Sequence, residues 1–186
     1  MCGIAGFAVS GGFEENLASK EAEAMAAALG HRGPDASGVW IDSKAGIAFA
    51  HRRLSVLDLT KAGSQPMVSA SGRYVISYNG EIYNHEQIRY ELRGNNFQWR
   101  GTSDTESLLA AIETWGLDRA LKKIVGMYAF SLWDKNKREL TLVRDRMGEK
   151  PLYYGLNNGR FFFGSELKAF RAHSQFKGDI NRDSVA

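Results

Sequence analysis

Two apolar segments in the second half of the chain are each followed, after a short polar turn, by another apolar segment. The first pair covers residues 127–133 and 140–143, and the second covers residues 152–156 and 161–163. A lysine-rich turn separates the first pair and an asparagine-glycine turn the second, so both pairs are predicted to be antiparallel hairpins. Such hairpins exclude a fold made only of alternating βαβ units, whose parallel strands need long crossover connections.

The rest of the chain adds strands and helices in separate groups. Apolar runs predict further strands at residues 4–9, 38–41, 46–50 and 74–78. Helical spacing of apolar residues predicts helices at residues 17–29, 86–93, 104–115 and 166–173. Residues 59–72 are rich in serine, glycine and proline and are predicted to form a long loop, of the kind that is often functional. This order predicts an α+β domain built on antiparallel sheets.

Composition limits the class of protein. A length of 186 residues fits one compact domain, and 44% hydrophobic residues can form a core without disulfides. The single cysteine favours a reducing compartment, and the absence of a signal peptide or an apolar run of membrane-spanning length favours the cytoplasm. The net charge of +3 is small and scattered, which argues against a nucleic-acid partner. The four histidines have no metal-ligand spacing, so no metal site is predicted.

Cys2 is the first candidate for catalysis. A free cysteine is ordinarily a small buried hydrophobic residue. Removal of Met1 would, however, give Cys2 a free α-amine with a pKa of about 7.7–8.0 beside a thiol with a pKa of about 8.5. One residue would then supply both a nucleophile and a base, which is the N-terminal nucleophile arrangement. The position alone leaves both interpretations open.

The dipeptide Asn79-Gly80 also has two interpretations. It is a strong signal for the turn of a β-hairpin. Acyl transfer, on the other hand, needs hydrogen-bond donors directed at a developing oxyanion, and an Asn amide beside a glycine N–H offers two.

Arg53, Asp104 and Glu81 are individually weak signals. Arg53 can be a solvated side chain, Asp104 suits a helix N-cap, and Glu81 is an unremarkable carboxylate after a turn. Together they suit a free amino acid, because a guanidinium binds an α-carboxylate and a carboxylate accepts from an α-ammonium.

Short motifs occur in order across nearly the whole chain. They are MCGIAG at residues 1–6, HRGPD at 31–35, RLS at 53–55, YNGEIYN at 78–84, SDTE at 103–106, RDR at 144–146 and KPLYY at 150–154. Together they resemble the class II glutamine amidotransferases, specifically the glutaminase domain of asparagine synthetases. Relatives that aminate sugar phosphates or phosphoribosyl substrates usually differ in the RGPD and NGEIYN segments, so the resemblance favours the asparagine synthetase branch.

The resemblance implies a four-layer αββα N-terminal nucleophile hydrolase fold over residues 1–186, with two antiparallel sheets between helical layers. It implies that Cys2 is the nucleophile, with its own α-amine as base. Asn79 and the Gly80 N–H would form the oxyanion hole. Glutamine would be hydrolysed to glutamate and ammonia through a glutamyl thioester.

The resemblance also implies a substrate pocket. Arg53 would bind the glutamine carboxylate, and Asp104, helped by Glu81, would bind the ammonium group. Backbone atoms of Val56 and Leu57 would line the same pocket.

The implied partners are glutamine and an ATP-dependent synthetase domain or subunit that receives the ammonia. Hydrolysis itself would need no cofactor, whereas ATP and magnesium would belong to the synthetase domain, which this sequence does not include. The amine acceptor, aspartate or another compound, is not visible, and a homodimer stays open. Two alternatives remain: an N-terminal cysteine acylase acting on another amide, and a non-catalytic domain with the same fold.

Overall fold

The computed structural model describes residues 1–56, 58–95 and 97–178, and its strands form two antiparallel sheets. The five-stranded sheet contains, in spatial order, β2 (Ala36–Asp42), β3 (Ile47–Arg53), β1 (Gly3–Val9), β9 (Arg160–Gly164) and β8 (Tyr153–Asn157). The four-stranded sheet contains β4 (Met67–Val68), β5 (Tyr74–Ile82), β6 (Gly126–Asp134) and β7 (Glu139–Arg144). The helices are α1 (Glu15–Ala28), α2 (His85–Glu91), α3 (Asp104–Trp115), α4 (Leu117–Lys123) and α5 (Leu167–Arg171), with short 3₁₀ turns η1 (Lys61–Gly63) and η2 (Arg93–Asn95).

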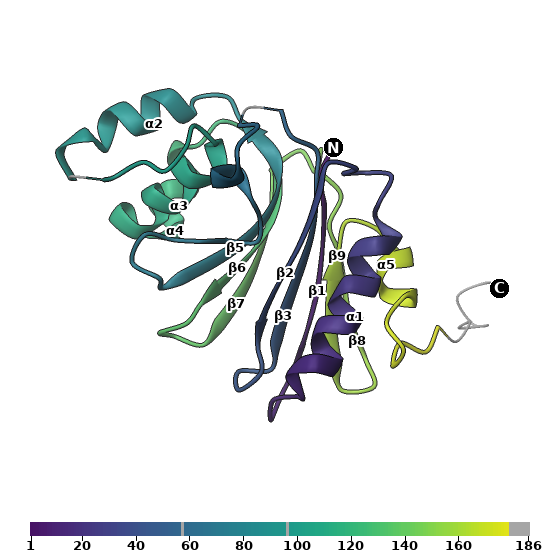
Figure 1. The fold of residues 1–186 in the computed structure, drawn as a ribbon. Coiled ribbons are helices and arrows are strands. Elements are labelled where there is room, and N and C mark those ends of the chain that lie inside the picture. The colour runs from purple at the N-terminus through teal and green to yellow at the C-terminus, as the bar shows by residue number, and fades with distance from the viewer. Residues whose placement is uncertain (57, 96, 179–186) are drawn as a thin grey trace.

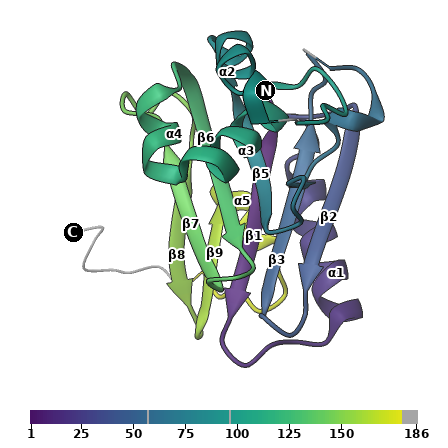
Figure 2. The same ribbon diagram turned by 90° about the vertical axis from the view of Figure 1, so that its left-hand side faces the viewer.

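The elements form four layers. Helices α1 and α5 cover the outer face of the five-stranded sheet, and α2, α3 and α4 lie beyond the four-stranded sheet (Figure 1). Figure 2 shows the same arrangement from the side, with α3 and α4 in front of the four-stranded sheet and α1 behind the other. The predicted α+β class and the four-layer αββα arrangement are therefore confirmed.

Alternation along β3 explains how the layers pack. Ile47 and Phe49 face the four-stranded sheet, and together with Phe163 of β9 they pack against Val75 and Trp133 of that sheet in a core between the sheets. The intervening alanines of β3 face α1, whose buried positions also include several alanines. Small residues on both surfaces let the helix approach the sheet closely, while the larger side chains fill the space between the sheets.

Both predicted hairpins are present. β6 pairs with β7 and β8 pairs with β9, each pair antiparallel. The interpretation of Asn79-Gly80 as a hairpin turn is wrong, because β5 continues through both residues to Ile82 and pairs with β6 along its whole length. A side chain at Gly80 would overlap the backbone of Met127 and Tyr128. The glycine is therefore required by a close approach of β6 rather than by a turn.

Two regions differ from the sequence prediction. The predicted loop at residues 59–72 contains η1 and the short strand β4, which pairs with β5. Helix α4 follows α3 after Gly116, whose φ of 79° ends one helix and starts the next. Within the described part of the chain, no helix has both the length and the apolar character needed to cross a membrane.

Candidate active site

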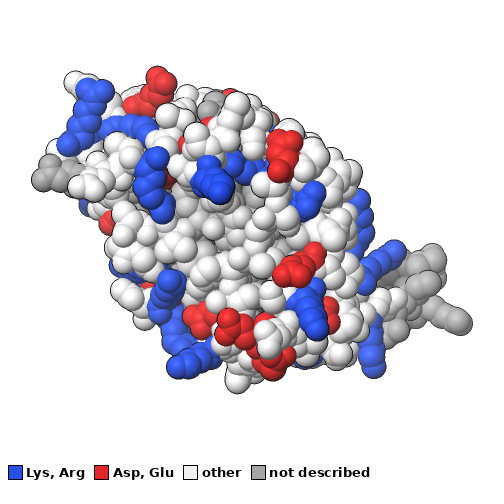
Figure 3. All heavy atoms as spheres, viewed as in Figure 1, with Lys and Arg blue, Asp and Glu red and all other residues white. Residues whose placement is uncertain are grey.

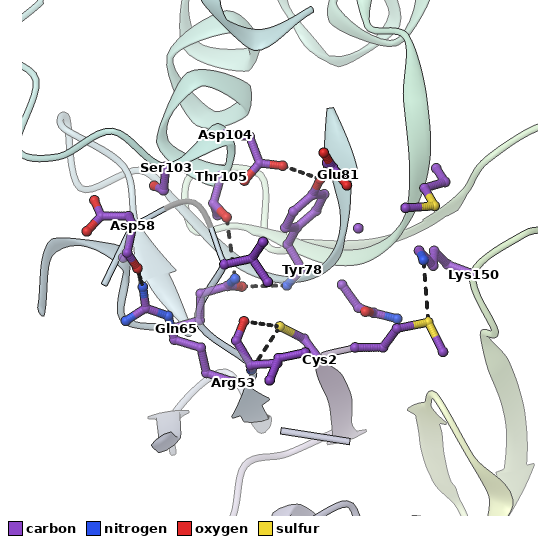
Figure 4. A pocket seen from close by; sticks show the side chains of 17 residues that line it. Cys2, Arg53, Asp58, Gln65, Tyr78, Glu81, Ser103, Asp104, Thr105 and Lys150 are labelled. Atoms are coloured by element: carbon purple, nitrogen blue, oxygen red, sulfur yellow. Dashed lines mark hydrogen bonds between the residues drawn. The ribbon is translucent and has the colours of Figure 1, made fainter. Parts of the chain in front are cut away.

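A cavity of about 170 Å³ lies where the start of β1, the end of β3 and the middle of β5 meet the first turn of α3 (Figure 4). The predicted site residues that the structure describes all line it, namely Cys2, Arg53, Val56, Asn79, Gly80, Glu81 and Asp104. Leu57, also predicted to line the pocket, lies outside the described residues. Segments far apart in the sequence are thus brought to one place by the pairing of β1 with β3 and by the packing of the two sheets.

Cys2 is held at the floor of the cavity by the chain that follows β3. Its Sγ accepts a hydrogen bond from the Leu54 N–H at 3.4 Å and lies 3.6 Å from the Leu54 carbonyl oxygen. Burial raises the pKa of the Cys2 thiol, while the Leu54 N–H and the charge of Arg53 act in the opposite direction. Because burial dominates, the thiol is protonated at neutral pH and needs a base before it can act as a nucleophile.

Met1 occupies part of the same cavity. Its Sδ lies 3.4 Å from Nζ of Lys150, a lysine that is only 6% exposed. The nitrogen of Cys2 forms the peptide bond to Met1 in this structure. A free α-amine beside the thiol therefore requires removal of Met1.

Asn79 carries an unusual hydrogen-bond donor. The residue is 1% exposed, and its side-chain nitrogen has no hydrogen-bond partner among the described residues. Buried polar groups in folded proteins are nearly always paired, because an unpaired one costs about 1–3 kcal/mol. An unpaired amide on the wall of a cavity is suited to a ligand oxygen that the free protein lacks.

The Gly80 N–H points to the same side of β5 as its two even-numbered neighbours. The Tyr78 N–H donates to Gln65 Oε1 at 2.7 Å, and the Ile82 N–H donates to Asp104 Oδ2 at 3.0 Å. Both bonds leave β5 on the side away from β6. Since N–H groups alternate along a strand, the Gly80 N–H is also directed away from β6, toward the cavity that Gly80 lines.

Arg53 supplies a buried positive charge at the end of β3. It is 9% exposed, and its guanidinium donates to the carbonyl oxygens of Asp58 and Thr60, the second at 3.0 Å. Within the described part of the chain it forms no ion pair. The two loop carbonyls fix the orientation of the planar guanidinium.

Asp104 supplies the opposite charge from the first turn of α3. It is 6% exposed, and its Oδ2 accepts from the Tyr78 hydroxyl at 2.7 Å and from the Ile82 N–H. It forms no ion pair with any described residue either. Lys150, Asp58 and Glu81 also line the cavity. Buried charges are costly unless paired, and the opposite charges of Arg53 and Asp104 are complementary to the two ends of a zwitterion.

Comparison with known proteins decides the family. The model of the glutamine amidotransferase domain matches residues 1–186. The chain belongs to this family. Asparagine synthetase [glutamine-hydrolyzing] 3 of Bacillus subtilis is 38% identical over 190 residues, covering 100% of this chain and 30% of the relative. Amidase chyE of Penicillium rubens is 38% identical over 181 residues, covering 92% of this chain and 26% of the relative.

The fold of this chain is similar to that of a solved amidotransferase structure. The glutamine phosphoribosylpyrophosphate amidotransferase of B. subtilis, complexed with ADP and GMP, superposes with a TM-score of 0.78 at 22% identity. The superposition covers 94% of this chain and 44% of that one. The predicted resemblance to glutamine amidotransferases and the N-terminal nucleophile hydrolase fold are thus confirmed. This glutamine amidotransferase domain spans less than a third of the length of the asparagine synthetase and of the amidase named above.

The sequence analysis assigned no role to several residues of the site, among them Gln65 and Tyr78. Gln65 lies in the segment predicted as a loop, yet its side chain bridges the Tyr78 N–H and the Thr105 hydroxyl, the latter at 3.4 Å. Tyr78 was part of a motif but had no assigned role, whereas its hydroxyl positions Asp104. No local signal marks Gln65, because its partners lie on other elements. The Tyr78 role could have been inferred only from its place beside Asn79.

The N-cap interpretation of Asp104 is wrong. Ser103 is the N-cap of α3, and its hydroxyl accepts from the Glu106 N–H at 3.3 Å. The Asp104 carboxylate is therefore not used to cap the helix. Among the described residues, no group of three or more His, Cys, Asp or Glu side chains is arranged to hold a metal ion.

Proposed function

We propose that this glutamine amidotransferase domain hydrolyses glutamine to glutamate and ammonia through a thioester on Cys2. The observation that carries the proposal is the buried Asn79 amide, whose nitrogen has no hydrogen-bond partner among the described residues and which lies in the same cavity as the chain's only thiol. A relative named as glutamine-hydrolysing, 38% identical over the whole chain, supports the choice of substrate.

The charges of the cavity support a free amino acid rather than a peptide amide. Arg53 would bind the α-carboxylate with its planar fork, and Asp104 would accept from the α-ammonium. Glu81 lines the cavity on the β5 side and would add to the attraction for the ammonium group. A substrate blocked at either end would leave one of the buried charges unpaired, at a cost of several kcal/mol. This disfavours the acylase alternative.

The proposed reaction begins once Met1 has been removed. The free α-amine of Cys2 takes the thiol proton, and the thiolate attacks the side-chain carbonyl carbon of glutamine. The Asn79 amide and the Gly80 N–H donate to the oxyanion of the tetrahedral intermediate. The carbon–nitrogen bond then breaks, and the ammonium form of the amine gives its proton to the departing ammonia.

The second half of the reaction uses the same groups. The α-amine takes a proton from water as the water attacks the thioester carbon, and the oxyanion again forms beside Asn79 and Gly80. Collapse releases glutamate and returns the proton to Cys2. Protein groups supply every proton transfer in this sequence, so we propose no cofactor for hydrolysis.

The ammonia acceptor is a further part of the proposal. We propose that ammonia passes to an ATP-dependent synthetase domain or subunit that uses magnesium and makes asparagine in the cytoplasm. The similarity to an asparagine synthetase more than three times longer than the matched region supports this assignment. A different amine acceptor is the second candidate, because a relative with the same identity to this chain is not named an asparagine synthetase.

Glutamine hydrolysis by the wild type and by Cys2→Ala tests the proposal. The wild type should release glutamate, Cys2→Ala should not, and an electrophilic glutamine analogue should add once to the wild type. N-acetylglutamine and a glutamine ester, each lacking one charge, should be hydrolysed at least tenfold more slowly than glutamine. Activity in Cys2→Ala would contradict the assignment of the nucleophile, and equal rates on the blocked substrates would favour the acylase.

A further inference from the structure

His51 is a buried polar residue between the two sheets. It lies on β3, on the same face as Ile47 and Phe49, and is 1% exposed. Its Nε2 lies 2.9 Å from the carbonyl oxygen of Tyr78 on β5, so the side chain joins one sheet to the other. Its Nδ1 has no hydrogen-bond partner among the described residues.

The protonation state of His51 follows from its surroundings. Burial lowers the pKa of the imidazole to about 4, and the nearby charge of Arg53 acts in the same direction, whereas the bond to Tyr78 opposes both. The ring is therefore neutral at physiological pH. Because a carbonyl oxygen can only accept, the single ring proton is on Nε2 and is donated to Tyr78.

The hydrogen bond from His51 to the Tyr78 carbonyl oxygen fixes the peptide unit directly before the proposed oxyanion donors. The Tyr78 carbonyl and the Asn79 nitrogen belong to the same planar peptide, so fixing that oxygen fixes the start of the Asn79-Gly80 segment. On the other side, β3 pairs with β1 in register from Gly3, directly after Cys2. His51 thus connects the strand pair that carries the nucleophile to the strand that carries the donors.

Packing alone does not account for a histidine at this position. The preceding positions on the same face of β3, Ile47 and Phe49, carry apolar side chains that join the core between the sheets, and the following position is Arg53 at the cavity. A buried imidazole with one unpaired nitrogen costs stability that an apolar side chain would not cost. The directional bond to Tyr78 is what an apolar residue cannot supply.

We infer that His51 is a positioning residue that sets the distance between Cys2 and the oxyanion donors of β5. The inference rests on the proposed glutamine hydrolysis. It assigns to His51 an effect on the transition state rather than on glutamine binding, because the substrate charges are held by Arg53 and Asp104.

Three variants test the inference in protein with Met1 removed. His51→Leu removes the donor and keeps the volume, so kcat for glutamine should fall by about 10–100-fold, as expected when donors move by a fraction of an ångström, with KM within about twofold. His51→Gln can place an amide nitrogen near the position of Nε2 and should restore kcat to within about fivefold of wild type. Ser77→Ala is the matched control, because it removes another bond between the sheets, from the Ser77 hydroxyl to the Ala50 carbonyl at 3.4 Å, and should leave kcat unchanged.

Alkylation of Cys2 by iodoacetamide separates positioning from general damage. This reaction forms a carbon–sulfur bond with loss of iodide and develops no oxyanion, so its rate should be the same in wild type and His51→Leu. If His51→Leu does not fold, His51→Asn takes its place with the same expectations, because its shorter side chain cannot reach Tyr78.

The outcomes are distinct. If the wild type does not hydrolyse glutamine, the proposed function fails and the inference with it. If the wild type is active and the variant lacking the donor keeps its kcat, the inference alone is overturned. Equal losses in kcat and in the alkylation rate would also overturn it, because they would place the effect on the nucleophile or on the fold.

Discussion

Replacing Asn79 with leucine should change activity and stability in opposite directions. The side chain is buried, and its nitrogen has no partner among the described residues. Leucine has the same branched side-chain skeleton with larger methyl groups and no polar group, so the substitution removes the donor without creating a void. The proposed function places this donor on the oxyanion, where it contributes only during the reaction.

The two magnitudes follow from that difference. A buried donor without a partner costs about 1–3 kcal/mol, so Asn79→Leu should stabilise the free protein by about 1 kcal/mol or more. Loss of one oxyanion donor typically lowers kcat by about 10²–10³-fold, which corresponds to roughly 2.7–4 kcal/mol in the transition state. KM should change little, because the ground-state carbonyl depends less on this donor than the oxyanion does.

Urea denaturation and steady-state glutamate release measure the two effects on the same samples. The urea midpoint should rise without a change in the slope of the unfolding free energy against urea, and kcat should fall. Asn79→Asp is a matched control that keeps the shape but replaces the donor by an acceptor, so it should lose activity without gaining stability. A variant Asn79→Leu that loses stability, or that turns over glutamine at a near-normal rate, would refute the account of the unpaired amide.

Two further predictions concern the charges and the acid stability of the fold. Asp104→Ala should raise KM for glutamine by roughly 10–100-fold, because a hydrogen bond to a charged group contributes about 1.5–3 kcal/mol. Asp104→Asn should lose most of the same affinity. Unchanged KM values in both variants would show that the substrate pocket is misplaced. Burial lowers the pKa of His51 from 6.5 to about 4, so the unfolded chain binds a proton that the folded chain does not, and stability is lost as pH falls from about 6.5 to 4. His51→Gln should therefore gain about 3 kcal/mol relative to wild type between pH 7 and pH 4, and a difference that is constant with pH would contradict the neutral buried histidine.

Sequence signals within a short segment correctly predicted the elements whose formation depends on that segment alone. The two hairpins of β6–β7 and β8–β9 were found because their turns have suitable residues between apolar segments. The dipeptide Asn79-Gly80 gave the same local signal and was misleading, since pairing with β6 keeps β5 extended through it. A long strand partner therefore overrides the preference of two residues for a turn.

The candidate site was predicted from motifs rather than from periodicity. Cys2 was predicted from its place after Met1, and Arg53 and Asp104 from the complementary charges that an amino acid needs. Gln65 and His51 could not be found in this way, because each acts through Tyr78 on another element. Contacts between sheets depend on register and layer packing, which no short segment encodes.

The charge distribution of the surface agrees with a small, neutral substrate. On the face shown in Figure 3, the described Lys and Arg side chains are interspersed with Asp and Glu. Such a surface does not provide the long-range steering that a strongly charged ligand would gain from one sign of charge. Substrate selection is instead expected inside the cavity, at Arg53 and Asp104.

The identity of the base is the central claim of the proposed mechanism. In this structure the Cys2 nitrogen is a peptide nitrogen, and Met1 fills part of the cavity beside Lys150. A peptide nitrogen cannot accept the thiol proton, and burial keeps the pKa of that thiol raised. The chain that retains Met1 should therefore be folded and inactive.

Glutamate release by two forms of one preparation tests this claim most directly. One form carries a removable extension before Cys2, and the other is trimmed by a protease so that Cys2 is the first residue, as verified by intact mass. At equal concentration and with equal urea midpoints, the trimmed form should hydrolyse glutamine and the extended form should show no activity above that of Cys2→Ala. Hydrolysis by the extended form at a rate close to that of the trimmed form would contradict the mechanism, because the α-amine could not then be the base.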